Sequence, residues 1–202
     1  MHTSDEFEKE IWHQGLLAVG IDEAGRGPLA GPLAVGGVVF PADYDGGDIY
    51  DSKKLTEKKR EELYDKIVSE ALWYKIVLVE PAEIDRLNIL EATRKAMSEI
   101  ALAAPAEIVL TDAMKLYIDK PVHDIIKGDQ KSVSIAAGSI LAKVTRDHIM
   151  YELDGKYPQY NFRSNKGYPT KDHLEALEKY GVTAIHRRSY RPVREALQGK
   201  LF

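Results

Sequence analysis

Four carboxylates in this sequence stand out by their positions relative to the short apolar runs. Asp22 and Glu23 close the first run, Asp112 closes a later one, and Asp129 lies in the polar segment 127–131. Strand ends in an α/β sheet are the usual place for an active site, because the sheet holds converging loops rigidly. A carboxylate set without His or Cys suits Mg²⁺ or Mn²⁺ and suits zinc poorly. The alternative for each acid is a structural one, as a helix cap or the partner of a nearby lysine.

A cluster of carboxylates carries an electrostatic cost that divalent cations remove. Neighbouring carboxylates repel and raise one another's pKa, and a bound cation reverses that effect. Two cations roughly 3.5–4 Å apart activate a water and stabilise the leaving oxygen during in-line attack on a phosphodiester. Metal-dependent phosphodiester hydrolysis is therefore one chemistry that these residues could perform.

A glycine-rich segment follows the first pair of acids. Residues 25–30, Gly-Arg-Gly-Pro-Leu-Ala, fit the G-x-G-x-x-A form of a dinucleotide-binding loop, which would indicate an oxidoreductase. That loop must open a helix, yet Pro28 and Pro32 bracket the turn and residues 35–40 have strand character. No Gly-Lys-Ser/Thr follows, so it is not a Walker loop either. We interpret the segment as a turn whose bare backbone lets a substrate group approach closely.

The C-terminal quarter is basic and carries aromatic residues. Tyr168 follows an aromatic and basic run over 157–166, and an aromatic ring among cations can stack on a sugar or base while the cations neutralise phosphates. Residues 186–189, His-Arg-Arg-Ser, are either a phosphate-binding segment or a solvated turn. We interpret the other aromatic residues of the run as packing residues, namely Tyr157, Tyr160 and Phe162.

Composition and charge exclude several classes of protein. The 202 residues contain no cysteine, which excludes disulfides, thiolate nucleophiles and cysteine-ligated zinc and favours a reducing cytoplasm. Residues 156–202 hold ten basic and four acidic side chains, a net charge of +6, so the overall charge of −4 leaves −10 on residues 1–155. Such asymmetry indicates a polyanionic partner. No apolar stretch approaches the roughly 18 residues that span a bilayer, so no membrane partner is expected.

The hydrophobic pattern predicts a mixed α/β sheet in one compact domain. Strands are expected over residues 16–21, 33–40, 74–79 and 107–111, the first two as a hairpin. Helices are expected within 51–71 after Thr56 as N-cap, over 84–104, within 133–150 after a polar and β-branched start, and from Thr170 to Gly181.

Seven segments together resemble the bacterial type 2 ribonuclease H (ribonuclease HII) family. In chain order they lie at residues 22–32, 51–55, 111–113, 127–129, 135–144, 167–170 and 186–189, and the resemblance runs from about residue 16 to residue 194. The extra substrate-binding domain of type 3 enzymes is not expected in this chain, and this favours type 2 over type 3. Two positions depart from the family pattern, with Gly138 where alanine is more common and Tyr190 where phenylalanine is common.

The resemblance implies a ribonuclease H-like fold with a five-stranded mixed sheet flanked by helices and a C-terminal helical region. It implies a single catalytic domain over 1–202, in which residues 151–202 contribute to substrate binding. Asp22, Glu23, Asp112 and Asp129 would be the catalytic carboxylates and would bind Mg²⁺ or Mn²⁺, two cations during catalysis. Recognition of the substrate 2′-OH would fall to Gly25, Arg26, Gly27 and Tyr168.

The activity that this resemblance implies is that of an endoribonuclease. It would act on the RNA strand of RNA/DNA hybrids and incise 5′ of single ribonucleotides in duplex DNA, leaving a 3′-OH and a 5′-phosphate. A monomer is expected, and a non-catalytic hybrid-binding module is the alternative. Motif position makes five further residues candidates for phosphate contacts: Lys53, Lys54, Ser139, Lys143 and Arg188.

Overall fold

The computed structural model of this chain describes residues 3–199. The chain divides into two compact units. Residues 1–24, 34–77 and 93–144 form the first, called the sheet unit below, and residues 25–33, 78–92 and 145–202 form the second, called the helical unit. The prediction of a single domain remains a prediction.

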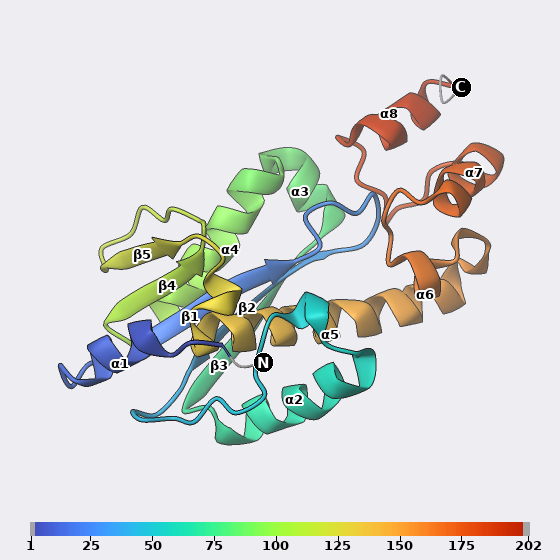
Figure 1. The fold of residues 1–202 in the computed structure, drawn as a ribbon. Coiled ribbons are helices and arrows are strands. Elements are labelled where there is room, and N and C mark those ends of the chain that lie inside the picture. The colour runs from blue at the N-terminus through green and yellow to red at the C-terminus, as the bar shows by residue number, and fades with distance from the viewer. Residues whose placement is uncertain (1–2, 200–202) are drawn as a thin grey trace. The chain divides into compact units, whose positions relative to one another are not determined.

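A five-stranded mixed sheet, in the order β3-β2-β1-β4-β5, is the framework of the sheet unit (Figure 1). β1 pairs antiparallel with β2 and parallel with β4, and β4 pairs parallel with β5. The strands are β1 (Ala18–Ala24), β2 (Leu33–Val39), β3 (Trp73–Val79), β4 (Ile108–Asp112) and β5 (Val122–Ile125). The fold expected from the sequence is confirmed, including the antiparallel pairing of the first two strands.

The helices mostly follow the expected pattern. The α-helices are α1 (Glu6–Trp12), α2 (Glu57–Glu70), α3 (Pro81–Leu87), α4 (Ile89–Ala103), α5 (Val133–Lys156), α6 (Phe162–Asn165), α7 (Lys171–Tyr180) and α8 (Arg191–Leu197). Short 3-10 turns are η1 (Ser52–Lys54), η2 (Gly128–Gln130) and η3 (Pro158–Tyr160). The Thr56 hydroxyl accepts from the Lys59 N–H and caps α2 as predicted. Thr170 occupies the N-cap position of α7, but its hydroxyl bonds Asp172 instead of the helix backbone.

The single helix predicted over 84–104 is wrong, because Asn88 divides it into α3 and α4. Asn88 has a left-handed φ of 70°, which interrupts the helical backbone. Its side-chain oxygen accepts from the N–H groups of Leu90 and Glu91, at 3.0 and 3.1 Å, and so caps the start of α4. Apolar spacing continues across the break, and the sequence pattern therefore hides it.

Glycines let α5 lie directly against the sheet. A Cβ on Gly20 of β1 would lie 2.2 Å from the backbone nitrogen of Ile135, and one on Gly36 of β2 would lie 2.3 Å from the Gly138 carbonyl oxygen. The opposite face of β2 carries Gly37, where Ile100 of α4 fills the space of the missing Cβ. Helices thus cover both faces of the sheet at these positions.

The N-terminus of α5 is fixed by a buried acid. Glu8 of α1 is fully buried, and its Oε1 accepts from the Ser132 hydroxyl and, at 2.9 Å, from the Ser134 N–H. Burial raises the pKa of Glu8, while these hydrogen bonds lower it in part. The contact holds the start of α5, a few residues beyond Asp129, in a fixed position.

The helical unit has its own apolar core. Tyr160 and Phe162 stack with ring centroids 5.3 Å apart and are at most 1% exposed, and Leu29 and Met150 pack in the same cluster. Tyr157 packs against its edge, which confirms that these three aromatic residues serve packing. Within residues 3–199, no helix is long and apolar enough to cross a membrane.

Replacement of Gly20 by alanine should destabilise the protein. The new methyl group would overlap backbone atoms of α5, and overpacking of this kind costs about 1–3 kcal/mol. Gly155→Ala is the matched control. Gly155 lies in α5, the helix that Gly20 contacts, and a Cβ at Gly155 would meet nothing within 4 Å. Urea denaturation should give a lower midpoint for Gly20→Ala and an unchanged or higher one for Gly155→Ala. Equal midpoints for Gly20→Ala and the parent would contradict this account of the packing.

Candidate active site

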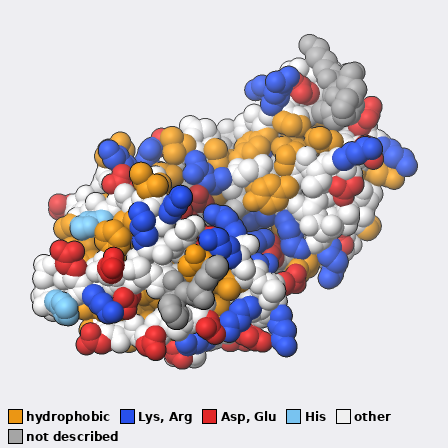
Figure 2. All heavy atoms as spheres, in the orientation of Figure 1, with side chains coloured by type: hydrophobic (Ala, Val, Ile, Leu, Met, Phe, Trp, Pro, Cys, Tyr) orange, Lys and Arg blue, Asp and Glu red, His pale blue; other side chains and the backbone are white. Residues whose placement is uncertain are grey.

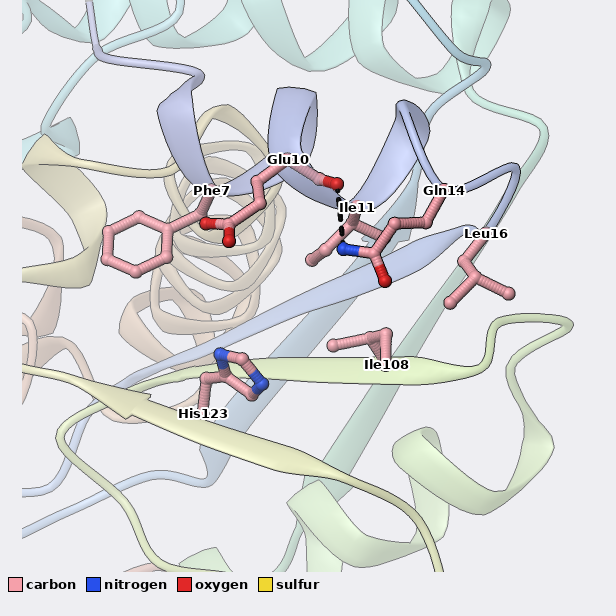
Figure 3. A pocket seen from close by; sticks show the side chains of 7 residues that line it. All are labelled: Phe7, Glu10, Ile11, Gln14, Leu16, Ile108 and His123. Atoms are coloured by element: carbon pink, nitrogen blue, oxygen red, sulfur yellow. Dashed lines mark hydrogen bonds between the residues drawn. The ribbon is translucent and has the colours of Figure 1, made fainter.

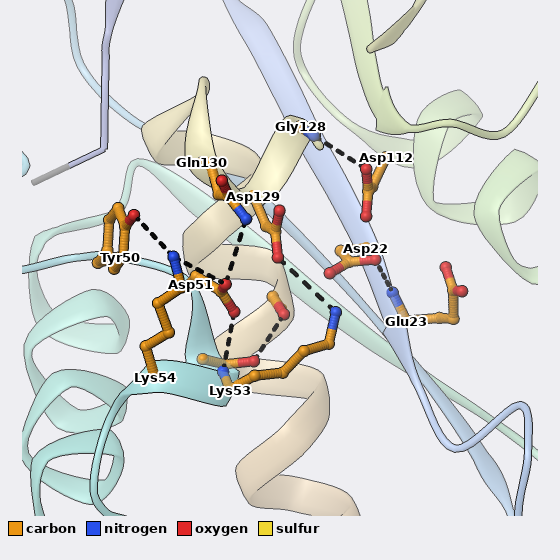
Figure 4. A network of polar contacts seen from close by, with 12 residues as sticks. Asp22, Glu23, Tyr50, Asp51, Lys53, Lys54, Asp112, Gly128, Asp129 and Gln130 are labelled. Carbon is orange, nitrogen blue, oxygen red and sulfur yellow. Dashed lines mark hydrogen bonds and ion pairs between the residues drawn. The ribbon is translucent and has the colours of Figure 1, made fainter. Parts of the chain in front are cut away.

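The four predicted carboxylates all lie in the sheet unit. β1 runs three residues beyond its expected end and includes Asp22 and Glu23, while Asp112 is the last residue of the neighbouring parallel strand β4. Asp129 comes from η2, whose position is tied to β4 because the Gly128 N–H donates to Asp112 Oδ1 at 2.9 Å. In Figure 4 the carboxylates of Asp22, Asp112 and Asp129 are turned toward one another.

Asp22 bears the largest electrostatic cost at this site. Its side chain is buried, and burial raises its pKa well above the usual range, with further contributions from the charges of Glu23 and Asp112. The Glu23 N–H donates to Asp22 Oδ1 at 2.8 Å, and a hydrogen bond from Ser139 also favours the ionised form. These two bonds offset only part of the cost, which leaves a carboxylate whose negative charge needs compensation.

Asp51 is a further acid of the site to which the sequence interpretation gave no role. It is buried, and its Oδ1 accepts from the Lys53 N–H at 3.0 Å, which caps η1. Burial raises the pKa of Asp129, and the neighbouring carboxylates Asp51 and Asp112 raise it further. Asp51 begins the segment 51–55, one of the seven segments that carry the resemblance, but that segment suggested a role only for its lysines.

Lysines of η1 reach these acids from one side. Lys53 Nζ lies 3.8 Å from Asp129 Oδ2, and Lys54 Nζ lies 4.0 Å from Asp51 Oδ2. Burial lowers the pKa of Lys53, but the surrounding carboxylates outweigh it and raise the pKa overall. Basic side chains are also seen over this region in the space-filling view (Figure 2).

Ser139 connects η1 and α5 beneath the acids. Its hydroxyl lies 3.0 Å from the Ser52 hydroxyl, both are buried, and Ser139 also bonds Asp22. Lys143 lies one helical turn further along α5 and is half-buried. The structure thus brings four of the five predicted phosphate-contact residues, Lys53, Lys54, Ser139 and Lys143, into the sheet unit.

The donor chemistry of this site fits a divalent cation. All of the candidate ligands are carboxylate oxygens, and burial, together with the charges of neighbouring carboxylates, raises the pKa of Asp22 and of Asp129. Within residues 3–199, no three His, Asp or Glu side chains are already disposed around one point to hold a metal. Mg²⁺ commonly binds through one or two carboxylates and keeps several waters, so a closed protein cage is not required.

A shallow hollow elsewhere in the sheet unit has a different character (Figure 3). It has a volume of about 150 Å³ and is lined by Phe7 and Ile11 of α1, Leu16, Ile108 of β4, and the polar residues Glu10, Gln14 and His123. The side-chain amide of Gln14 donates to the backbone carbonyl of Glu10 at 3.0 Å. Because the acids lie at the other ends of β1 and β4, this hollow is separate from them.

In the helical unit, the glycine turn and Tyr168 lie side by side. A Cβ on Gly27 would lie 3.3 Å from Tyr168 Cε1, so the ring rests close to bare backbone. The Leu29 N–H donates to the Gly167 carbonyl at 2.7 Å, which joins the two segments directly. Tyr168 is 43% exposed, so its ring is available to a ligand.

A buried histidine pair holds the backbone of Tyr168. The Thr183 N–H donates to His186 Nδ1 at 3.1 Å, which leaves the proton of His186 on Nε2. That N–H donates to His173 Nε2 at 3.1 Å, and His173 Nδ1–H then donates to the Tyr168 carbonyl at 2.9 Å. The sequence did not predict this chain of bonds, since thirteen residues separate the two histidines.

The segment 186–189 is neither wholly solvated nor wholly available to phosphate. His186 and Arg187 are buried, so the solvated-turn interpretation is wrong for these two. Arg188 is exposed, and its backbone N–H donates to Asp85 Oδ2 at 2.8 Å. Its predicted contact with phosphate remains a prediction.

Comparison with known proteins identifies the class and then the family. The crystal structure of ribonuclease H2 from Pyrococcus horikoshii OT3 superposes with a TM-score of 0.75 at 29% identity, covering 91% of this chain and 98% of that one. The fold is therefore that of a type 2 ribonuclease H. The Ribonuclease HII family profile matches residues 19–193.

Curated relatives agree with that match. Ribonuclease HII of Leuconostoc mesenteroides is 49% identical over 195 residues, which are 95% of this chain and 77% of the relative. Ribonuclease HII of Desulfitobacterium hafniense is 52% identical over 194 residues, which are 94% and 75% of the two chains. This chain belongs to the ribonuclease HII family and is a ribonuclease H hydrolase.

Divalent cations should stabilise the protein through the carboxylates. A cation at 100 times its Kd adds about 2.7 kcal/mol to the free energy of unfolding. We expect millimolar Mg²⁺ or Mn²⁺ to raise the parent's melting temperature, and Asp22→Asn to raise it without metal but to reduce the metal-induced shift. Asp119→Asn, at an exposed acid of the same unit, is the control. A full metal-induced shift in Asp22→Asn would exclude Asp22 as a ligand.

The histidine pair should make stability depend on pH. Burial lowers the pKa of both rings, that of His186 to about 3 with a further contribution from His173, although Asp172 opposes the shift at His173. The unfolded chain therefore binds protons first, and stability present above pH 6.5 is lost as the pH falls. Between pH 7 and 5 the loss from His186 is about 2 kcal/mol. Urea denaturation at both pH values should show a smaller loss in His186→Gln; an equal loss would assign the effect elsewhere.

Proposed function

We propose that this chain is an endoribonuclease that hydrolyses the RNA strand of RNA/DNA hybrids and incises 5′ of single ribonucleotides in duplex DNA. The products would be a 3′-OH and a 5′-phosphate. The observation that carries this proposal is the buried, mutually repelling carboxylate group at the ends of β1 and β4 in a chain of the ribonuclease HII family. Removal of stray ribonucleotides from DNA is the corresponding cellular task.

Two divalent cations, Mg²⁺ or Mn²⁺, would supply the activation of water and the stabilisation of the leaving oxygen. Asp22, Glu23, Asp112 and Asp129 would hold them. The chain's own contribution is the positioning of these groups. The Glu23 N–H and Ser139 orient Asp22, while Gly128 fixes Asp112. Lys53 and Lys54 lie close enough to the acids to meet substrate phosphates there.

Recognition of the ribose would fall to the turn Gly25–Gly27 and to Tyr168. The 2′-OH both donates and accepts a hydrogen bond, and it distinguishes RNA from DNA at a single position. Backbone without a Cβ at Gly27, next to an accessible aromatic ring, suits contact with a sugar. Because a sugar would be read and not a base edge, little sequence preference is expected.

We also propose that the protein acts as a cytoplasmic monomer. A chain without cysteine is compatible with a reducing compartment. Its basic C-terminal quarter, with a net charge of +6 over residues 156–202, fits a polyanionic duplex as partner.

A duplex carrying one ribonucleotide tests the proposal. The parent should incise it 5′ of the ribonucleotide only when Mg²⁺ or Mn²⁺ is present, and should leave the all-DNA duplex intact. Asp112→Asn keeps an oxygen for the Gly128 N–H but loses the charge, so we expect incision to fall more than about 100-fold while the duplex still binds. Tyr168→Ala should impair incision at the single ribonucleotide.

The outcomes separate the alternatives. Binding without incision by the parent under both metals would favour a non-catalytic hybrid-binding module. Near-normal turnover by Asp112→Asn would remove that acid from the active site, and parental activity in Tyr168→Ala would remove the tyrosine from ribose recognition.

A further inference from the structure

The carbonyl of Arg26, inside the glycine turn, is held by two side chains of the segment 187–190. Arg187 Nη1 donates to it at 3.2 Å, and the Tyr190 hydroxyl donates to it as well. Arg187 Nη1 also donates to the Tyr190 hydroxyl oxygen at 3.1 Å, so the three groups form a closed triangle. The Tyr190 hydroxyl therefore bonds both the anchoring guanidinium and the carbonyl that it holds.

Two buried arginines bond the backbone that follows this turn, at residues 30–32. Arg187 is fully buried, and its Nε and Nη2 donate to the Gly31 carbonyl at 3.1 and 2.9 Å, so one guanidinium joins residues 26 and 31. Arg146, 1% exposed, donates to the carbonyls of Ala30 and Pro32 at 3.1 and 2.9 Å. Positive charge of this kind is costly to bury, and its hydrogen bonds here go to the turn's backbone.

The segment that carries Tyr190 is itself anchored. Asp85 of α3 accepts from the N–H groups of Arg188 and Ser189, each at 2.8 Å, and from the Ser189 hydroxyl. The Tyr190 ring lies beneath the Arg187 guanidinium at 5.3 Å. These contacts fix the segment 188–190 and so fix the position of the Tyr190 hydroxyl next to the turn.

A held carbonyl fixes more than one atom. The peptide bond between Arg26 and Gly27 is planar and trans, so its C=O and N–H point in opposite directions. Two donors that fix the Arg26 carbonyl therefore also direct the Gly27 N–H away from Arg187 and Tyr190. Gly27 is the residue that lies against the ring of Tyr168.

We propose that Tyr190 is a specificity-determining positioning residue: its hydroxyl, with Arg187, sets the plane of the Arg26–Gly27 peptide and thereby aims the Gly27 N–H at the ribose 2′-oxygen. This inference rests on the proposed function, because it requires that the turn reads a 2′-OH. It assigns the discrimination between ribose and deoxyribose partly to a side chain that does not touch the sugar.

Tyr190→Phe is the sharp test, since it removes one hydroxyl and keeps the ring under Arg187. Affinity is measured in the Asp112→Asn background for two duplexes of one sequence, one with a single ribonucleotide and one all-DNA. One hydrogen bond corresponds to about 3- to 10-fold in affinity. We expect Tyr190→Phe to weaken binding of the ribonucleotide duplex by that factor and to leave binding of the all-DNA duplex unchanged.

Controls separate positioning from general damage. Tyr180→Phe, at an exposed tyrosine of the same unit, should change neither affinity. Asp85→Asn, which weakens the base of the segment, should lower the ribonucleotide preference in the same direction. Equal loss on both duplexes in Tyr190→Phe, or no loss on either, would overturn the inference. A parent that shows no preference and no incision would instead refute the proposed function.

Discussion

The close approach of α5 to β1 and β2 is the contact on which the carboxylate site depends. It exists because Gly20, Gly36 and Gly138 leave no side chain between helix and strands. The residue after Gly138 is Ser139, whose hydroxyl reaches both Asp22 and Ser52, so the helix delivers a hydrogen bond to the most costly acid of the site. A hydrogen bond weakens steeply with distance and angle, and a side chain at Gly20 or Gly36 would displace the helix that presents Ser139.

The acids repel one another, so the site needs a positive charge that the neighbouring side chains do not fully supply. Lys53 forms an ion pair with Asp129, yet its side chain is 77% exposed and its Nζ lies 3.8 Å from Asp129 Oδ2. An exposed ion pair of that length contributes little, whereas the buried Asp22 charge needs a strong partner. A divalent cation has the charge and the preference for oxygen ligands that the lysine lacks. The four carboxylates contribute to the net charge of −10 on residues 1–155, and bound cations would offset that part of it.

Local sequence patterns predicted the sheet and most helices, because alternating and helical apolar spacing report directly on one face of an element. They failed where a single side chain overrides the pattern, as Asn88 does, and where an element is as short as β5. The carboxylates could be found because strand ends and acids coincide. Asp51 and the pair His173–His186 could not, since their roles arise from partners distant in the chain. The resemblance supplied the fifth strand and the residue roles, which the pattern alone did not.

Glycine explains how the turn at residues 25–27 can approach a substrate, but it does not explain how the turn could discriminate. A glycine-rich backbone has more conformations to lose on ordering than any other. A backbone N–H whose direction is not fixed therefore contributes little to selectivity. The buried guanidinium groups of Arg146 and Arg187 restrict that freedom by donating hydrogen bonds to the carbonyls of residues 26, 30, 31 and 32. Burying their charges costs free energy, and hydrophobic side chains in the same place would have given equal or greater stability. Buried charge of this kind is explained by a requirement for a rigid turn, and in the proposed role the determinants of selectivity lie behind the surface that meets the sugar.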